Sequence, residues 1–318
     1  MSGTNNNGGS RNHAELPIPN GWYAVAWSEE LAPGDVKRAH YFDKELVLFR
    51  TESGKACVFD AYCPHLGAHL GVGGKVEGES IRCPFHAWRY DTGGTCVEIP
   101  YAKRIPAKAR TKAWDVVERN GMVMAWHHRD NKPPFFEAPS LSEFSDPEWA
   151  IAEHWDLNVN VHVQEMAENN CDPAHFIYIH GSEEIPTSDL SYDGLTMKMS
   201  STYARDTVIG SFDAELERIA WGLGLASVRI KGIPGAGLLM FSSTTPIDNA
   251  HSHSRWAFAV TKNLAGTVGA EFVESLKAEG GVMADVPIWE NKIHRPDPLL
   301  CDGDRFIGEF RRWAKNFY

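Results

Sequence analysis

The chain has 318 residues and a formal net charge of −11, with 43% hydrophobic and 23% charged residues. This length favours two domains, the composition is that of an ordinary globular protein, and the negative charge argues against nucleic acid as a general partner. No apolar run approaches the roughly 20 residues that a membrane-spanning helix needs, so no membrane span is predicted.

The N-terminal segment is polar and rich in Gly and Asn (MSGTNNNGGSRNHAE). It lacks the basic-then-apolar pattern of a signal peptide, so we predict a disordered tail over residues 1–17 of a cytoplasmic protein. Short apolar runs then alternate with Gly-containing turns, as in LVLFR, ACVFDAYC and GMVMAWHH. This pattern predicts a small antiparallel β domain over 18–135, and the paired prolines at 131–140 predict a linker at its end.

The second half, residues 136–318, mixes helical and strand periodicities. A helix is predicted around 162–180, strand-like segments follow from about 195 to 262, and two helices are predicted near 268–292 and 303–317. Runs of strands followed by helices favour an α+β fold. The sequence therefore predicts a β domain followed by an α+β domain.

Two Cys/His pairs lie in Pro/Gly turns that follow strand-like runs. Cys63 and His65 are two residues apart in AYCPHLGAHL, and Cys83 and His86 are three apart in IRCPFHAWRY. Two thiolates and two imidazoles match a Rieske [2Fe–2S] cluster, in which two histidines replace two cysteines on one iron. The alternative is a structural zinc site, although zinc fingers usually order their ligands Cys-Cys-His-His.

The two pairs resemble the Rieske signature C-x-H…C-x2-H, including Pro after each Cys and the aromatic Trp88. Rieske proteins of respiratory complexes carry two further cysteines bonded across the loops, whereas Ala68 and Phe85 stand at those positions here. Trp88 also replaces a Ser whose hydroxyl donates a hydrogen bond to sulfur in those proteins. Both losses favour the lower-potential, oxygenase branch, with a pure electron-transfer protein as the alternative.

The segment VQEMAENNCDPAHFIYIHG carries Glu168, Asp172, His175 and His180. On a helix the first three would share one stripe, because their spacing is four and three. His180 is five beyond His175, so both reach one metal only if the helix widens or ends there. Apolar neighbours indicate burial, and buried charges need partners or metals. The alternative is a solvated acidic face with two incidental histidines.

This segment resembles the Rieske oxygenase signature E-x3-D-x2-H-x4-H. The resemblance implies one [2Fe–2S] cluster and one mononuclear Fe(II) per chain, with His175 and His180 binding the mononuclear iron and O2 as co-substrate. It also implies that Asp172 links the two metal centres. In the family, the cluster of one chain serves the iron of its neighbour, so the implied route runs from His86 of one subunit through Asp172 of the next, in a homotrimer.

The facial triad also needs a carboxylate. The candidates in PLLCDGDRFIGEF are Asp302 and Asp304, and helical periodicity does not choose between them. In the family the ligand is commonly followed five residues later by Glu, as Asp304 is followed by Glu309. The resemblance therefore predicts Asp304 as the third ligand.

Beyond the metal motifs, the chain resembles the 3-ketosteroid 9α-hydroxylase oxygenases and related sterol-acting Rieske enzymes, in DAYCPHLGAHLGVGGKV, IPYAKRIPAKAR and IWENK. The resemblance implies a helix-grip-like catalytic domain with an antiparallel sheet. It further implies a terminal oxygenase that hydroxylates or demethylates an apolar polycyclic substrate, a steroid or sterol. A smaller aromatic or terpenoid substrate is the alternative.

The chain shows no flavin- or nicotinamide-binding pattern, so a separate NAD(P)H-dependent reductase must deliver electrons, with or without a ferredoxin. A segment without acids follows the second Cys/His pair closely. A docking surface for an acidic donor and a merely solvated strand explain this segment equally well. Its basic residues are Lys103, Arg104, Lys108, Arg110 and Lys112.

Overall fold

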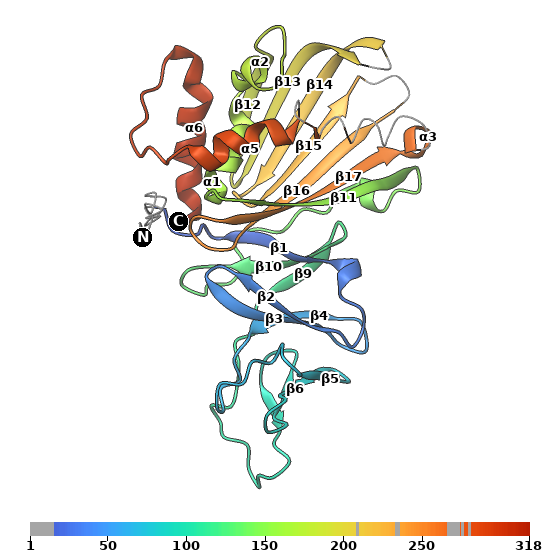
Figure 1. The fold of residues 1–318 in the computed structure, drawn as a ribbon, viewed down its shortest axis with the longest axis vertical. Helices are drawn as coiled ribbons and strands as arrows, with labels where there is room; N and C mark the ends of the chain where they lie inside the picture. Colours follow the sequence, from blue (N-terminus) through green and yellow to red (C-terminus); the bar gives the residue numbers. More distant parts are fainter. Residues whose placement is uncertain (1–15, 208–209, 233–235, 266–273, 275–276, 279–280) are drawn as a thin grey trace, which may run out of the picture.

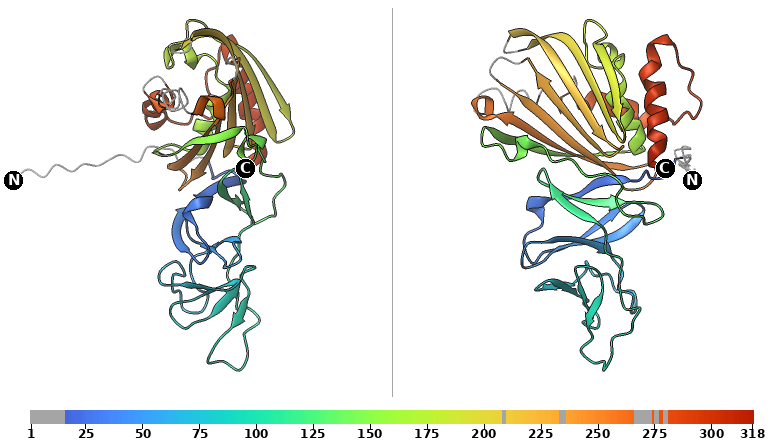
Figure 2. Two further views of the ribbon diagram at one scale, coloured as in Figure 1. Left: turned by 90° about the vertical axis from the view of Figure 1, so that its right-hand side faces the viewer. Right: turned by 180° about the vertical axis from the view of Figure 1, so that it is seen from behind.

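A computed structural model describes residues 16–318 except 208–209, 233–235, 266–273, 275–276 and 279–280. Most of the predicted N-terminal tail therefore lies outside the described residues. The described chain is elongated, with small sheets at one end and one large sheet at the other (Figures 1 and 2). Among the described residues, no helix is both long and apolar enough to cross a membrane.

Three small antiparallel sheets form the first part, in the orders β1-β10-β9, β2-β3-β4 and β5-β6-β7-β8. Most residues of the central strands are buried on both faces, so these strands have continuous apolar runs rather than alternation. Their bounds are β1 (Gly21–Trp27), β2 (Val36–Tyr41), β3 (Lys44–Arg50), β4 (Ala56–Asp60), β5 (Lys75–Glu77), β6 (Ser80–Arg82), β7 (Arg89–Asp91), β8 (Cys96–Glu98), β9 (Val116–Arg119) and β10 (Met122–His127).

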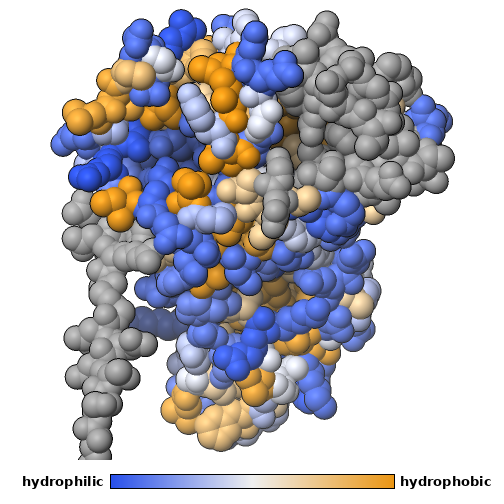
Figure 3. All heavy atoms as spheres, turned by 45° about the horizontal axis from the view of Figure 1, so that its top comes forward, coloured by the Kyte–Doolittle hydropathy of each residue, from blue (hydrophilic) through white to orange (hydrophobic). Residues whose placement is uncertain are grey.

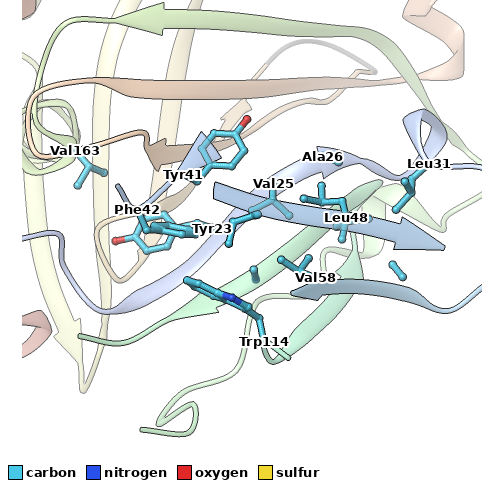
Figure 4. Packing of buried hydrophobic residues seen from close by; sticks show 14 residues of the cluster. Tyr23, Val25, Ala26, Leu31, Tyr41, Phe42, Leu48, Val58, Trp114 and Val163 are labelled. Carbon is cyan, nitrogen blue, oxygen red and sulfur yellow. The ribbon is translucent and has the colours of Figure 1, made fainter. Parts of the chain in front are cut away.

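Aromatic rings fill the core of the first two sheets (Figure 4). The ring of Phe42 lies 5.4 Å from that of Tyr23 and 5.3 Å from that of Trp114. Val163, which begins the first α-helix of the second part, packs into the same cluster. The helix that leads to the second predicted metal site is therefore anchored on the core of the first part.

The second part is built on one seven-stranded antiparallel sheet, in the order β11-β17-β16-β15-β14-β13-β12. Register is continuous along most pairs, with one irregularity between Ile151 and Glu153 of β11. The α+β class with an antiparallel sheet in the second part is thus confirmed. The strand bounds are β11 (Trp149–Val159), β12 (Thr187–Asp193), β13 (Thr196–Thr207), β14 (Gly210–Trp221), β15 (Leu225–Lys231), β16 (Leu238–Pro246) and β17 (Ser252–Thr261).

Helices cover part of this sheet. Met166 and Trp289, from two different helices, pack with Val159 and Val161 at the end of β11. The helices are α1 (Val163–Glu168), α2 (His175–Tyr178), α3 (Lys262–Ala265), α5 (Val282–Asn291) and α6 (Arg305–Ala314), and the 3-10 turns are η1 (Ser28–Glu30), η2 (Ser142–Phe144), η3 (Asn169–Cys171), η4 (Asp302–Asp304) and η5 (Lys315–Phe317).

The helix predicted over 162–180 is broken into α1, η3 and α2. Asp172 has an extended backbone between the last two, and Pro173 cannot donate to a helical ladder. The helix predicted near 268–292 is described mainly as α5, because most of its first half lies outside the described residues. The helix predicted over 303–317 is confirmed as α6 with η5.

Candidate metal centres

Cys63 and Cys83 begin two loops of matching backbone form. In each loop the Cys N–H donates to the carbonyl five residues later, at 2.9 and 2.8 Å. The N–H four residues later donates back to the Cys carbonyl, at 2.9 and 3.1 Å, and these donors belong to Gly67 and Ala87. Both donors have left-handed backbone, with φ of 76° and 58°. The two loops are therefore closed locally, by their own backbone.

These loops bring the cysteines together on one side and the histidines on the other. Cys63 and Cys83 are both buried, and burial, as the largest cause, raises the pKa of the Cys83 thiol. The rings of His65 and His86 lie 4.7 Å apart, edge to face. Trp88 stacks on His65 with 4.5 Å between ring centroids. Such a split of sulfur from nitrogen ligands is the one that a Rieske [2Fe–2S] cluster requires.

A single-ion zinc site fits this arrangement poorly. Its ligand atoms would all lie about 4 Å or less from one another, given zinc bonds of roughly 2.0–2.3 Å. Among the described residues, these four side chains supply no set of three ligand atoms mutually within 4.8 Å. The buried Nδ1 of His86 makes no hydrogen bond to any described residue, so an iron there would satisfy it.

The second centre joins His175 and His180 with Asp285. One ligand atom from each lies within 4.8 Å of the other two, and His180 Nε2 is 3.4 Å from Asp285 Oδ2. His175 Nδ1 is buried without a hydrogen bond among the described residues. The helix α2 ends at Tyr178, between the two histidines, and this brings both to one point, which an unbroken helix would not. Two imidazoles and one carboxylate suit a mononuclear Fe(II).

Asp304, the predicted third ligand, does not join this group in the described structure. Its Oδ2 accepts a hydrogen bond from the Cys301 N–H at 3.0 Å, which caps the turn η4 ahead of α6. Asp285 occupies the carboxylate position instead, and its Oδ1 accepts from the Asn169 side chain at 3.0 Å. The sequence signal for Asp285 is its place three residues before IWENK, a segment that resembles the family.

Asp172 lies beside the histidine pair. Its Oδ2 is 3.6 Å from His175 Nδ1, and its Oδ1 accepts the Ala174 N–H at 2.9 Å. Burial alone would raise the pKa of Asp172, but the nearby His175 imidazole and the backbone N–H groups outweigh it and lower this pKa. A carboxylate held in this way can fix the orientation of the His175 imidazole.

A buried ionic network holds α1, which precedes both histidines, against the C-terminal segments. Lys292 Nζ is 2.7 Å from Glu165, and His294 Nδ1 is also 2.7 Å from Glu165. Arg311 of α6 binds Glu168 through two nitrogens, at 2.6 and 3.1 Å. Burial would raise the pKa of Glu165, but Lys292 and His294 lower it overall. Glu168 therefore serves this network and does not continue the predicted stripe.

A cavity of about 710 Å³ opens beside the second centre. This volume lies in the range of small-molecule sites, roughly 300–1,000 Å³. His175, His180 and Asp285 line it, and most of its remaining wall is apolar. Among the apolar lining residues are Met166, Phe176, Leu216, Leu223, Val228, Ile230, Met240, Trp256 and Trp289.

The end of the molecule that carries the Cys/His loops exposes large apolar side chains, and orange spheres gather at the lower end of Figure 3. These exposed residues are Tyr62, Leu66, Phe85, Tyr101 and Ile105. The predicted basic segment lies beside them, with Lys103, Arg104 and Lys108 exposed. Lys112 differs, because its Nζ lies 4.2 Å from the Trp114 ring centroid and burial lowers its pKa.

Comparisons with known proteins cover both parts of the chain. A family model described as the 3-ketosteroid 9alpha-hydroxylase C-terminal domain matches residues 125–318, and one described as the Rieske [2Fe-2S] domain matches 21–111. The chain is 31% identical to a cholesterol 7-desaturase of Ciona intestinalis, over 96% of this chain and 70% of that protein.

The chain is also 32% identical to a 3-ketosteroid-9-alpha-monooxygenase, oxygenase component, of Rhodococcus rhodochrous, over 94% of this chain and 80% of that one. The crystal structure of dicamba monooxygenase bound to dicamba matches with a TM-score of 0.74 at 19% identity, over 94% of this chain and 96% of that one. At this identity the match speaks for the fold.

Proposed function

The chain belongs to the Rieske oxygenases with a 3-ketosteroid 9α-hydroxylase C-terminal domain, and on this premise we propose that it oxidises a steroid or sterol. It is the terminal oxygenase component of its system, works with a separate reductase, and carries a [2Fe–2S] cluster and a mononuclear iron. The observation that carries the substrate proposal is the apolar cavity beside His175 and His180, which suits a large apolar skeleton.

In this proposal each metal group has its own residues. The iron is held by His175, His180 and Asp285, in place of the Asp304 expected from the sequence. When bound, the cluster supplies electrons and the iron binds O2. The chain itself positions the substrate and excludes water, through the apolar wall on which β14 to β17 converge. The cluster is held by Cys63, His65, Cys83 and His86.

Asp172 is proposed to orient His175 and to connect it with His86 of a neighbouring subunit. Its 3.6 Å approach to His175 Nδ1 supports the first role. The exposed Tyr62, Leu66 and Phe85 beside the cluster loops support the second, because apolar surface of this kind favours a protein contact. A repeated head-to-tail contact forms either a closed ring or an open filament, and the proposed assembly is a ring of three identical chains.

The reductase, or a ferredoxin between the two, is proposed to dock on the exposed basic side chains of Lys103, Arg104 and Lys108. Their charge contrasts with the overall −11 of the chain and would attract an acidic donor. A cytoplasmic location belongs to the same proposal, since none of the six cysteines, all of which lie in the described part of the chain, forms a disulfide, as is usual in a reducing compartment.

A substrate screen with a surrogate reductase tests the substrate proposal. Sterols, 3-ketosteroids and smaller aromatic or terpenoid compounds would be offered in parallel, with products identified by mass spectrometry. We expect oxygenated, demethylated or desaturated products from the polycyclic group only. A His180→Ala control should lose the mononuclear iron, keep the cluster absorbance and form no product. Turnover restricted to small aromatic compounds would refute the steroid assignment.

A further inference from the structure

Strand β14 places a cation in the apolar wall of the cavity. Alternate residues of a strand face one side, and here Leu216, Arg218 and Ala220 line the cavity. Glu217 faces away from it and binds Lys198 and Lys231. Arg218 is only 5% exposed. Among the described residues that line the cavity, Arg218 is the one lysine or arginine.

The Arg218 guanidinium is oriented from two sides. Its Nη1 donates to the hydroxyl of Ser201 at 3.0 Å, and Ser201 is itself buried and paired with Ser188 at 2.8 Å. On the other side the guanidinium carbon lies 4.8 Å from the Phe176 ring centroid. A cation held by a hydroxyl and a ring face loses little further freedom when it binds a ligand.

The same ring connects Arg218 with the iron site. Phe176 lies 4.6 Å from the ring of His175 and 5.1 Å from that of His180. One aromatic ring therefore separates the guanidinium from the imidazoles that would hold the iron. A substrate group bound to Arg218 would lie close to the carbon that is oxidised.

The chemistry of the guanidinium selects the type of group. It has five N–H donors and no acceptor, and it stays charged in a protein. A carbonyl oxygen accepts a hydrogen bond from such an N–H and has no donor group of its own that needs a partner. A hydroxyl also accepts, but its own O–H then needs a second partner in the cavity, so a carbonyl oxygen is satisfied by the guanidinium with fewer demands on the wall.

We propose that Arg218 binds a carbonyl oxygen of the substrate, from a ketone or a carboxylate, and so sets which carbon faces the iron. This inference rests on the proposed function, because it takes the cavity beside His175 and His180 as the site of a steroid-like substrate. It goes beyond that function by assigning the polar end of the substrate to one side chain. Arg218 acts in it as a specificity residue.

Ligand pairs measured on the metal-loaded protein test this inference. One pair has a steroid ketone and the same skeleton with a methylene at that carbon, and a second has a steroid carboxylate and its methyl ester. A third compound carries a hydroxyl at the ketone position. Affinity is measured by calorimetry for wild type, Arg218→Met, Arg218→Lys and the control Lys231→Met, which removes an exposed cation from the next strand.

We expect wild type and Lys231→Met to bind the ketone or the carboxylate roughly 10- to 100-fold more tightly than its partner, the effect of one hydrogen bond to a charged group. Arg218→Met should erase this ratio and leave the affinity of the methylene compound unchanged. Arg218→Lys should keep part of it, which guards against a folding defect in the Met variant. The pair with the larger ratio identifies the ketone or the carboxylate.

The inference would be overturned if the affinity ratio within a ligand pair were equal in wild type and Arg218→Met. It would also be overturned if the wild type bound and oxidised the steroids with an affinity ratio near one. Equal weakening of every ligand by Arg218→Met would also overturn it, because it would indicate a structural role. If no steroid binds to or is oxidised by the wild type, the proposed function itself fails, and this result differs from each of the others.

Discussion

Lys292→Met tests the buried ionic network that holds α1 beside the iron site. Lys292 Nζ lies 2.7 Å from Glu165 and 3.6 Å from Glu168. The Glu165 side chain is only 1% exposed, so its charge depends on the partners around it. Met keeps much of the length of Lys but has no charge. After this change, His294 remains as a basic partner of Glu165, at 2.7 Å.

The expected cost follows from the burial of this pair. Removing one partner of a fully buried ion pair costs about 3–5 kcal/mol. Lys292 is 29% exposed and His294 stays close to Glu165, so we expect a smaller loss, about 2–3 kcal/mol. For a domain of this size the melting temperature should fall by roughly 4–12 °C.

The same change should loosen the iron site. Lys292 directly follows α5, which carries Asp285 about two turns earlier. A weaker tether to α1 makes the placement of Asp285 against His180 less exact. Loss of a supporting contact of this kind typically weakens metal binding roughly 10- to 100-fold. The cluster loops make their own hydrogen bonds, so the cluster should be unaffected.

Circular dichroism melts and metal analysis after dialysis against a chelator measure these two effects. Lys231→Met is the matched control, because its ion pairs are exposed and should contribute less than about 1 kcal/mol.

The pKa of Glu165 is lowered in the folded state, so its stabilisation is present at neutral pH and is lost as the pH falls through that lowered pKa. The stability difference between Lys292→Met and wild type should therefore shrink in acid. A melting temperature equal to that of the control, or loss of the cluster together with the mononuclear iron, would refute this reasoning.

Three further experiments test the metal centres and the docking surface. Asp285→Ala should lose the mononuclear iron and turnover while the cluster absorbance stays, whereas Asp304→Ala should keep most of both; iron analysis decides, and the reverse result would restore Asp304 as the ligand. Asp172→Asn should keep the cluster and most iron yet lose nearly all turnover, so normal turnover would contradict a linking role. Charge reversal at Arg104 and Lys108 should slow reduction by the reductase but not by dithionite, and added salt should slow reduction of the wild type; stopped-flow rates that do not change would indicate a merely solvated segment.

The Rieske domain was predictable from the sequence because its chemistry is local. Cys63 with His65 and Cys83 with His86 lie in short loops, and each loop is closed by its own backbone hydrogen bonds. Spacing within such a loop largely determines where its side chains point. The ring contact between His65 and His86 needs only that the two loops face each other.

The second half was predictable in class and less so in detail. Period-2 alternation along β14 and its neighbours identified strands, but not the cation that Arg218 places in the cavity wall. The segment from 162 to 180 has the apolar spacing of one helix, and this led to the prediction of a single element. The extended backbone of Asp172 and the missing donor of Pro173 divide it. The end of α2 at Tyr178 then allows His180 to reach the same point as His175.

The proposed third iron ligand, Asp285, shows where reasoning from local sequence ends. Asp302 and Asp304 are both followed by a strongly amphipathic helix, and the spacing to Glu309 favoured Asp304. In the structure, however, the Asp304 carboxylate accepts the Cys301 N–H and caps the turn η4. Asp285 is placed by contacts with distant parts of the chain. Trp289, four residues later and on the same helical face, is buried against Met166 of α1. An acid on the buried face of a helix needs a partner, and that condition, applied to α5, would have selected Asp285 over a carboxylate in an exposed turn.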